Sequence, residues 1–157
     1  MAEQYSFITR WQIKAPLDKV WDAIYDSQYW PDWWDGVNKV KMITPGNTND
    51  IGDTREYTWK WIFPYSVNFT MRLVEIEKYK RIKGVVSGEV EGIGEWFFEE
   101  KNGITYVQYH WDIKTTVNWM NRMAFIMKPL FKIFHNLVMS WGAKGLAKKL
   151  NSQLLSY

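Results

Sequence analysis

Apolar and polar residues alternate along most of the first 115 residues, which is the pattern of half-buried β-strands. In the segment Tyr5–Ile13, for example, one face carries Tyr5, Phe7, Trp11 and Ile13, and the other carries Ser6, Arg10 and Gln12. Similar segments predict seven strands, which pair mostly with their sequence neighbours into an antiparallel sheet. The predicted strands are Tyr5–Ile13, Val37–Ile43, Thr54–Trp61, Ser66–Ile76, Arg81–Val90, Gly94–Glu100 and Ile104–Lys114.

Glycines mark several of the predicted turns and one unusual strand. Lys101-Asn102-Gly103 has the Asn-Gly pair typical of a tight hairpin, and Glu91-Gly92 predicts a turn before the sixth strand. Gly84 and Gly88 fall on the apolar face of the fifth strand. Glycine at such positions leaves room for a ligand or lets the strand bend.

Helical spacing replaces alternation in two places. After Pro16, the apolar residues Leu17, Val20, Trp21 and Ile24 form one stripe of a short helix, and Ser27–Asp35 predicts a second short helical piece. Beyond Thr116 the pattern is helical to the end of the chain. Since proline disfavours a helix interior, Pro129 predicts a short first helix and then a main helix from about Lys128 to Leu155. The apolar stripe contains Met120, Met123, Ala124, Met127, Leu130, Phe131, Phe134, Val138 and Trp141.

This order of elements predicts a single α+β domain over residues 1–157. The simplest arrangement is an antiparallel sheet wrapped around the last helix, with a hollow between them. The chain contains 18% aromatic residues, among them 11 tryptophans. That is more aromatic surface than a small core needs, so part of it is expected to line a cavity or an interaction surface.

Several classes of chemistry have no support in the sequence. Without cysteine, disulfides, thiol catalysis and cysteine-ligated metals are excluded. The two histidines have no Asp or Glu at helical spacing, so no metal site is expected, and no glycine-rich phosphate loop or nucleophile elbow is present. No cofactor is therefore predicted. The chain has no signal-peptide pattern and no apolar run of about 18 residues, so we expect a cytoplasmic protein.

Charge is distributed unevenly along the chain. Residues 113–157 contain seven Lys or Arg and no Asp or Glu, whereas the whole chain carries +3, so the first 112 residues are net acidic. A solvated helix face is one interpretation of this basic segment. The other is a transient contact with an anionic membrane surface or an anionic ligand. Nucleic acid is not expected as a partner, because the lysines are not interleaved with strand aromatics.

Two segments carry a family resemblance. They are I-x-A-P-x-x-x-V-W-x-x-I-x-D-x-x-x-W-P-x-W-W over Ile13–Trp34 and F-H-N-L-V-M-S-W-G-A-K-G-L over Phe134–Leu146. With the element order, they make the chain resemble the SRPBCC superfamily, which has the START and birch-pollen-allergen helix-grip fold, and its polyketide cyclase/dehydrase-like subgroup in particular. The resemblance implies a seven-stranded antiparallel sheet gripping the C-terminal helix, with two short helices between strands one and two and an apolar tunnel inside.

Three function classes stay open. The first is binding or carrying of a hydrophobic small molecule, such as a lipid, polyketide or aromatic compound. The second is a cyclase/dehydratase-like enzyme without a metal or nucleotide cofactor. The third is a membrane-surface or regulatory module that uses the basic C-terminal helix. The carrier needs only an apolar pocket, whereas the enzyme also needs an inward titratable group with a shifted pKa. Because the apolar pattern is the clearer of the two, we rank the carrier first.

Alternation and helical spacing give the candidate site. His135 borders the apolar stripe and is the candidate acid, base or polar anchor, while Glu56 and Glu95 are weaker catalytic candidates. His110 alternates with Trp111 and is expected to point outward. Trp30, Trp33 and Trp34 either clamp their segment onto the sheet or form an entrance gate or membrane contact. The expected cavity wall consists of Phe7, Trp11, Trp59, Trp61, Phe69, Met71, Trp96, Phe98, Tyr109, Trp111, Met123, Met127, Phe131 and Phe134.

Overall fold

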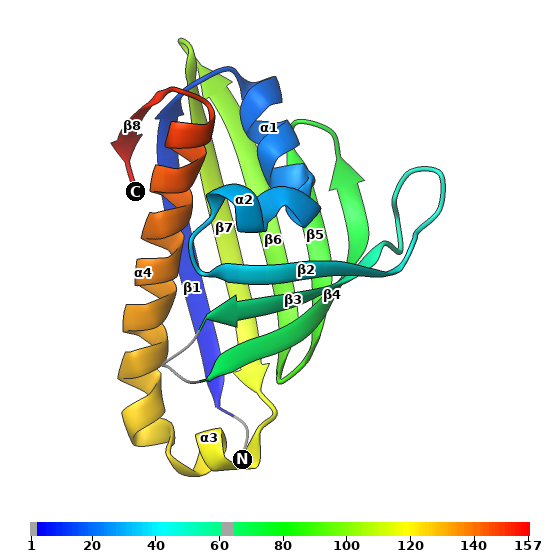
Figure 1. The fold of residues 1–157 in the computed structure, drawn as a ribbon, viewed down its shortest axis with the longest axis vertical. Helices are drawn as coiled ribbons and strands as arrows, with labels where there is room; N and C mark the ends of the chain where they lie inside the picture. Colours follow the sequence, from blue (N-terminus) through cyan, green and yellow to red (C-terminus); the bar gives the residue numbers. More distant parts are fainter. Residues whose placement is uncertain (1–2, 61–64) are drawn as a thin grey trace.

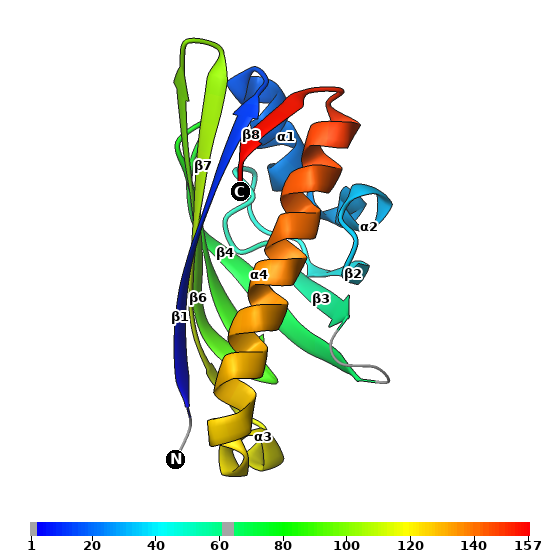
Figure 2. The ribbon, with the colours of Figure 1, turned by 90° about the vertical axis from the view of Figure 1, so that its left-hand side faces the viewer.

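The computed structural model describes residues 3–60 and 65–157. Within them an eight-stranded antiparallel sheet has the order β2-β3-β4-β5-β6-β7-β1-β8, and the long helix α4 lies along its concave side (Figures 1 and 2). The strands are β1 Gln4–Lys14, β2 Val37–Thr44, β3 Thr54–Lys60, β4 Ser66–Glu77, β5 Arg81–Gly88, β6 Val90–Lys101, β7 Ile104–Thr115 and β8 Gln153–Ser156. The helices are α1 Leu17–Tyr25, a 3₁₀ turn Ser27–Tyr29, α2 Trp30–Trp33, α3 Asn118–Arg122 and α4 Ala124–Lys149.

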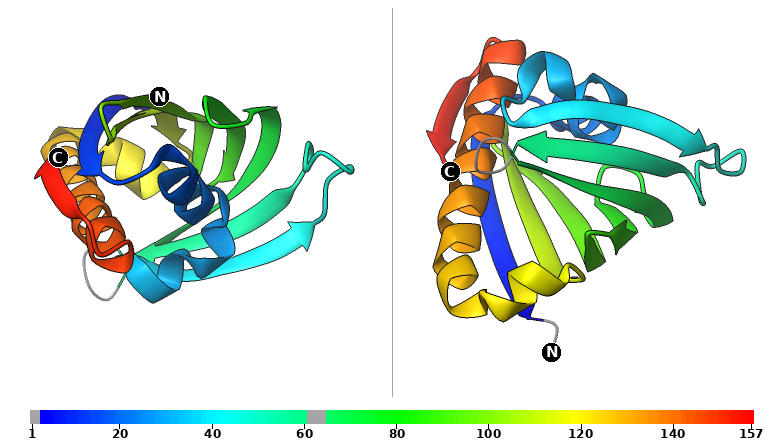
Figure 3. Two further views of the ribbon diagram at one scale, coloured as in Figure 1. Left: turned by 90° about the horizontal axis from the view of Figure 1, so that it is seen from above. Right: turned by 60° about the horizontal axis from the view of Figure 1, so that its bottom comes forward.

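The sheet curls around the helices. Seen from above, α1 lies inside the curl and α4 closes its open side, between β1 and the end of β3 (Figure 3). The connection Gly88–Val90 begins with a positive φ of 124° at Gly88, so the chain turns sharply there without a longer loop. The helix-grip architecture predicted from the element order is confirmed.

The predicted turn at Glu91-Gly92 is wrong. Both residues lie in β6, where Gly92 pairs with Ile113 of β7 at a φ of 151°. The turn occurs three residues earlier, at Gly88. Gly92 is needed because a Cβ at this position would lie 2.0 Å from the carbonyl oxygen of Asp112.

The C-terminal segment differs from the prediction at both ends. α4 begins at Ala124 and runs through Pro129, because only the Phe125 carbonyl loses a helical partner there. It ends at Lys149, earlier than the predicted Leu155. The chain then reverses, with a positive φ at Asn151, and β8 pairs with the edge of β1. β8 was not predicted.

Candidate functional site

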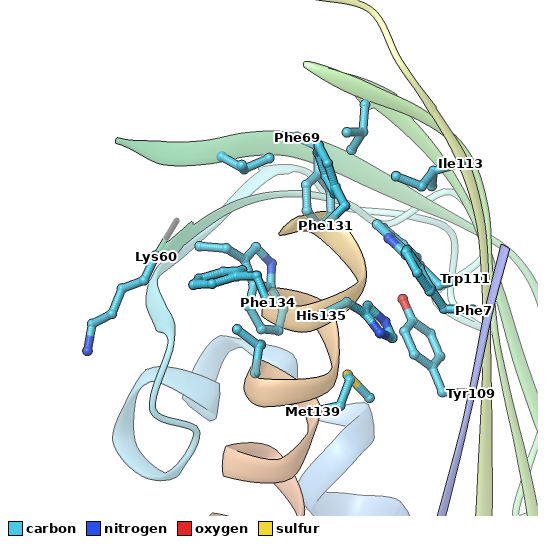
Figure 4. A pocket seen from close by; sticks show the side chains of 14 residues that line it. Phe7, Lys60, Phe69, Tyr109, Trp111, Ile113, Phe131, Phe134, His135 and Met139 are labelled. Carbon is cyan, nitrogen blue, oxygen red and sulfur yellow. The ribbon is translucent and has the colours of Figure 1, made fainter. Parts of the chain in front are cut away.

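An apolar cavity with a volume of about 90 Å³ lies between α4 and the sheet. Five of its lining residues belong to α4 and follow helical spacing, and the others belong to β1, β3, β4, β6 and β7 (Figure 4). The lining residues are Phe7, Trp59, Lys60, Val67, Phe69, Val90, Tyr109, Trp111, Ile113, Phe131, Phe134, His135, Val138 and Met139.

Strand register explains why the sheet residues meet there. Phe7 of β1 is opposite Trp111 of β7, and Trp59 of β3 is opposite Val67 of β4. Directly opposite residues in an antiparallel pair point to the same face, so each pair contributes two neighbouring side chains to the concave side. The alternation that predicted the strands therefore also sets which residues can reach the cavity.

His135 is the titratable group in the interior of this cavity. Its imidazole stacks on the ring of Phe7 with centroids 4.3 Å apart and planes 14° apart. Within the described part of the chain, neither ring nitrogen has a well-placed hydrogen-bond partner. Burial lowers the pKa of His135 to about 4, opposed in part by the adjacent Asn136 side chain. The imidazole is therefore neutral at neutral pH.

Tyr109 is the second polar group in the wall. Figure 4 shows its hydroxyl turned toward the cavity, on the same side as His135. Burial raises the pKa of Tyr109 well above 10, so the hydroxyl stays protonated at every physiological pH. The neutral imidazole of His135 carries one N–H donor and one acceptor nitrogen, and the Tyr109 hydroxyl adds another donor.

Seven of the expected wall residues line the cavity: Phe7, Trp59, Phe69, Tyr109, Trp111, Phe131 and Phe134. His135 does so as well. Lys60, Val67, Val90, Ile113, Val138 and Met139 also line it but were not named as wall residues. The sequence pattern could have identified most of them, since they share strand parity or helical spacing with the residues that were named.

Three expected wall residues are covered by tryptophans of the segment that contains the short helices, residues 17–34. Trp11 packs on Trp34, Trp96 packs on Trp30, and Phe98 packs on Trp21, with ring centroids 5.5, 6.2 and 4.9 Å apart. They face inward as predicted but do not line the main cavity. Alternation gives the face of a strand, but it does not say which helix covers that face.

Methionines account for most of the other differences. A Cβ at Gly84 would lie 2.5 Å from Cγ of Met71, so Met71 itself occupies the space that this glycine leaves. Met127 is buried outside the cavity wall, and Met123 is 41% exposed because it sits at the break between α3 and α4. Trp61 lies outside the described residues.

Neither glutamate candidate reaches the cavity. Glu56 is opposite Lys41 and Thr70 on the outer face of the sheet, since its neighbour Tyr57 points inward. Glu95, also on the outer face, forms an ion pair with Arg81. His110 lies there too, as expected, with its Nε2 2.8 Å from the Gln108 amide nitrogen.

The inward charges are instead Arg55 and Asp53. Arg55 donates to Ser27 Oγ at 2.8 Å and pairs with Asp53 at 3.2 Å, next to a second cavity of about 30 Å³. Ser27 also shares a hydrogen bond of 2.8 Å with the Tyr57 hydroxyl, whose pKa burial raises. Sequence analysis missed this cluster, although Arg55 has the same strand parity as Tyr57 and Trp59.

The tryptophan-rich segment is a clamp. Trp34 is 1% exposed, and its indole nitrogen donates to the Val138 carbonyl of α4 at 2.8 Å. A Cβ at Gly142 would lie 2.4 Å from this indole, so glycine is what allows the close approach. Trp30 is also buried. Of the two interpretations, the structure therefore favours the clamp over an entrance gate.

Among the described residues, no cluster of three or more histidine or acidic side chains is arranged to hold a metal ion. Over the same residues, no helix is both long and apolar enough to span a bilayer.

A family model described as polyketide cyclase/dehydrase and lipid transport matches residues 6–154. The chain belongs to this family. The match covers both segments that suggested the resemblance, and it includes every residue of the main cavity. No curated protein sequence matches the chain significantly.

Solved structures confirm the family's fold for this chain. The Zhui aromatase/cyclase from Streptomyces sp. R1128 is 12% identical, with a TM-score of 0.74 over 95% of this chain and 94% of the other. A START superfamily protein from Mycobacterium smegmatis is 12% identical, with a TM-score of 0.72 over 94% and 97%. A conserved protein from Geobacillus kaustophilus is 13% identical, with a TM-score of 0.74 over 97% and 100%. At these identities the likeness concerns the fold alone.

Proposed function

We propose that this protein binds and carries a hydrophobic small molecule in the cavity between α4 and the sheet. The observation that carries the proposal is the cavity wall, in which aromatic and aliphatic side chains surround His135 and Tyr109. An apolar wall with few, well-placed polar groups is the usual composition of a small-molecule site. Family membership supports the same class of ligand, since its description includes lipid transport.

The wall composition suggests what the ligand has in common with it. Flat aromatic rings from Phe7, Trp111 and Phe131 favour a ligand with rings or an extended hydrocarbon chain. One ligand oxygen facing His135 and Tyr109 would satisfy groups that have been taken out of water. A lipid, a polyketide or another aromatic compound meets both conditions.

The cavity is smaller than a usual ligand site, so side chains in its wall must move when a ligand binds. Its 90 Å³ is below the roughly 300 Å³ at which ligand pockets usually begin. Side chains of α4 such as Phe134 and Met139, which can change rotamer, would have to move outward to admit a ligand. We therefore expect uptake to widen the space beneath α4, while the sheet keeps its register.

Native mass spectrometry of the purified protein, followed by organic extraction, tests the proposal directly. A retained stoichiometric lipid or aromatic compound is the expected result. Binding of a fluorescent fatty-acid analogue is then compared between Ile113→Trp, which fills the cavity, and Ile93→Trp, the same change on the outer face of β6. Circular dichroism verifies that both variants are folded.

The carrier proposal fails if the protein is empty and takes up neither the fatty-acid analogue nor an aromatic polyketide analogue. It also fails if the two tryptophan variants bind the probe equally. The Phe134→Ala protein, whose cavity is larger, gives a second comparison that does not depend on overpacking the core.

A second candidate function is cyclase/dehydratase-like catalysis, and the unpartnered His135 is what favours it. Ring closure of a polyketide begins when a base removes a proton from a carbon between two carbonyl groups. The neutral imidazole of His135 can accept that proton, and the Tyr109 hydroxyl can donate a hydrogen bond to the carbonyl oxygen. A His135→Gln protein that binds a polyketide analogue but no longer converts it would support this function. Unchanged conversion by that variant would exclude it.

A further inference from the structure

The N-terminal half of α4 exposes an apolar surface that the cavity does not use. Phe125, Pro129, Ile133 and Leu137 follow one another at intervals of four residues, so they share one helix face. Phe125 is 80% exposed and Ile133 is 64% exposed. We call these four residues the outer stripe. It spans roughly 18 Å along the helix.

Aromatic residues extend the outer stripe at its lower end. Trp119 of α3 is 43% exposed, and its ring centroid lies 6.1 Å from that of Tyr65, which is itself 62% exposed. Met123, in the connection between α3 and α4, is also exposed. Scattered exposed apolar residues are ordinary, but exposed apolar residues that share one helix face, with further exposed aromatics near the start of that helix, mark an interaction surface.

Packing of the hydrophobic core does not explain why the outer stripe is apolar. The opposite face of α4 already supplies the buried residues, among them Met127, Phe131 and Val138. The N-terminal half of α4 is thus apolar on two faces, and only one of them is covered by the sheet. In water the second face contributes nothing to folding, so its composition calls for a partner.

Charge identifies the kind of partner. Lys128 and Lys132 lie along one flank of the outer stripe, Arg122 lies in α3 just before it, and Lys144 and Lys148 lie further along the same helix. Lys128 pairs with Glu3 at 2.7 Å, whereas Lys132 has no ion pair with any described residue. Residues 113–157 contain no acidic side chain. A second copy of this chain would bring the same positive segment against itself, which is unfavourable.

We propose that the outer stripe docks on an anionic lipid bilayer surface, with Phe125 and Ile133 inserted at the level of the headgroups. Apolar and aromatic side chains ringed by Lys and Arg are the composition of helices that lie in a membrane interface. Each basic residue near an anionic surface adds to the attraction. The docked face lies on the same helix as Phe131 and Phe134 of the cavity wall, so the cavity is within one helix diameter of the bilayer.

Flotation with vesicles tests the proposal without reference to any cavity ligand. Vesicles of phosphatidylcholine with about one-third phosphatidylserine are compared with pure phosphatidylcholine vesicles. We expect binding to the anionic vesicles only, falling steeply between about 0.05 M and about 0.5 M salt. Phe125→Glu and Ile133→Glu should each lower the partition coefficient roughly tenfold or more. Each removes an apolar side chain that is buried only on docking, and each adds a negative charge that the anionic lipids repel.

Two matched controls locate the surface. Ile8→Glu makes the same change at an exposed isoleucine on the outer face of β1, and Lys39→Glu reverses a charge on β2, outside the basic C-terminal segment. Neither should weaken binding as Ile133→Glu and Lys132→Glu do. Because Phe125 and Ile133 are exposed, their variants should keep the unfolding midpoint of the parent protein.

Several outcomes would overturn the proposal. They are no binding of the parent protein to anionic vesicles, equal binding to neutral vesicles, or equal losses in the Ile8→Glu and Ile133→Glu proteins. Light scattering that finds a dimer dissociated by Ile133→Glu would assign the outer stripe to self-association instead. The carrier proposal survives all of these results, since it concerns the opposite face of α4.

Discussion

The imidazole of His135 lies nearly parallel to the ring of Phe7, with 4.3 Å between the ring centroids. This stacking joins α4 to β1 across the cavity and fixes the plane of the only histidine that lines it. A stacked, desolvated imidazole without hydrogen bonds is poorly suited to carry a charge. Its protonation is therefore a sensitive measure of how closed the cavity is.

Titration of His135 should reflect this burial. We expect the imidazole to be protonated only as the pH falls to about 4, since burial lowers its pKa from 6.5. Nitrogen-detected NMR of the histidine side chains measures this, and the His135→Gln protein assigns the resonance. A midpoint near 6.5 would show that water reaches the ring freely.

The same pKa shift should make stability depend on pH. The folded-state pKa lies below the unfolded value, so the unfolded chain takes up the proton first. Stability is complete above about pH 6.5 and falls as the pH approaches 4. Between pH 7.5 and 5 the loss from this residue should be about 2 kcal/mol, measured by urea unfolding.

Variants separate this contribution from that of the carboxylates. His135→Phe should flatten the pH dependence over this range, whereas His110→Gln, a change on the outer face, should leave the slope as it is. An unchanged slope in the His135→Phe protein would contradict the assignment.

Substitution of Gly142 should destabilise the protein although alanine is the better helix former. The added Cβ would lie 2.4 Å from the Trp34 indole, and Trp34 is held by its hydrogen bond to Val138. We expect Gly142→Ala to cost roughly 1–3 kcal/mol in unfolding free energy. Lys144→Ala, two residues further on the exposed face, is the control and should change stability little. A gain in stability at position 142 would mean that Trp34 is not clamped.

The Arg55–Asp53 pair should behave as a coupled unit. Arg55→Met removes the bond to Ser27 and leaves the buried Asp53 without its cation, which should cost about 3–5 kcal/mol. Adding Asp53→Asn removes the unpaired charge, so the double variant should be more stable than Arg55→Met alone. Additive losses in urea unfolding would show that the two side chains do not interact.

The sequence predicted the face of each strand better than it predicted the cavity. Alternation placed Phe7, Tyr109 and Trp111 on the concave side because the period of a strand is two residues. It equally placed Trp11 and Phe98 there, but these contact Trp34 and Trp21 of the short helices. Which inward residues line a cavity depends on how the helices cover the sheet, and local periodicity carries no information on that.

Errors in the predicted elements have local causes. Glu91-Gly92 has the composition of a turn, but Gly92 is required for close contact between β6 and β7. Pro129 suggested a later helix start, yet its position near the beginning of α4 costs a single hydrogen bond. Arg55 was not among the predicted site residues because it is charged, although its strand parity is that of the inward residues and it contacts Ser27.

The two halves of α4 are packed differently. Its C-terminal half is held by Trp34 at Val138 and Gly142, and a Cβ at Gly145 would lie 1.9 Å from the Trp33 carbonyl oxygen. Its N-terminal half lies over the cavity and includes Pro129, which leaves the Phe125 carbonyl without a helical partner. A ligand larger than the cavity would therefore displace the N-terminal half of α4 outward, so that the helix tilts about a pivot near Gly142. The tilt angle of α4 relative to the sheet would then increase with the size of the bound ligand.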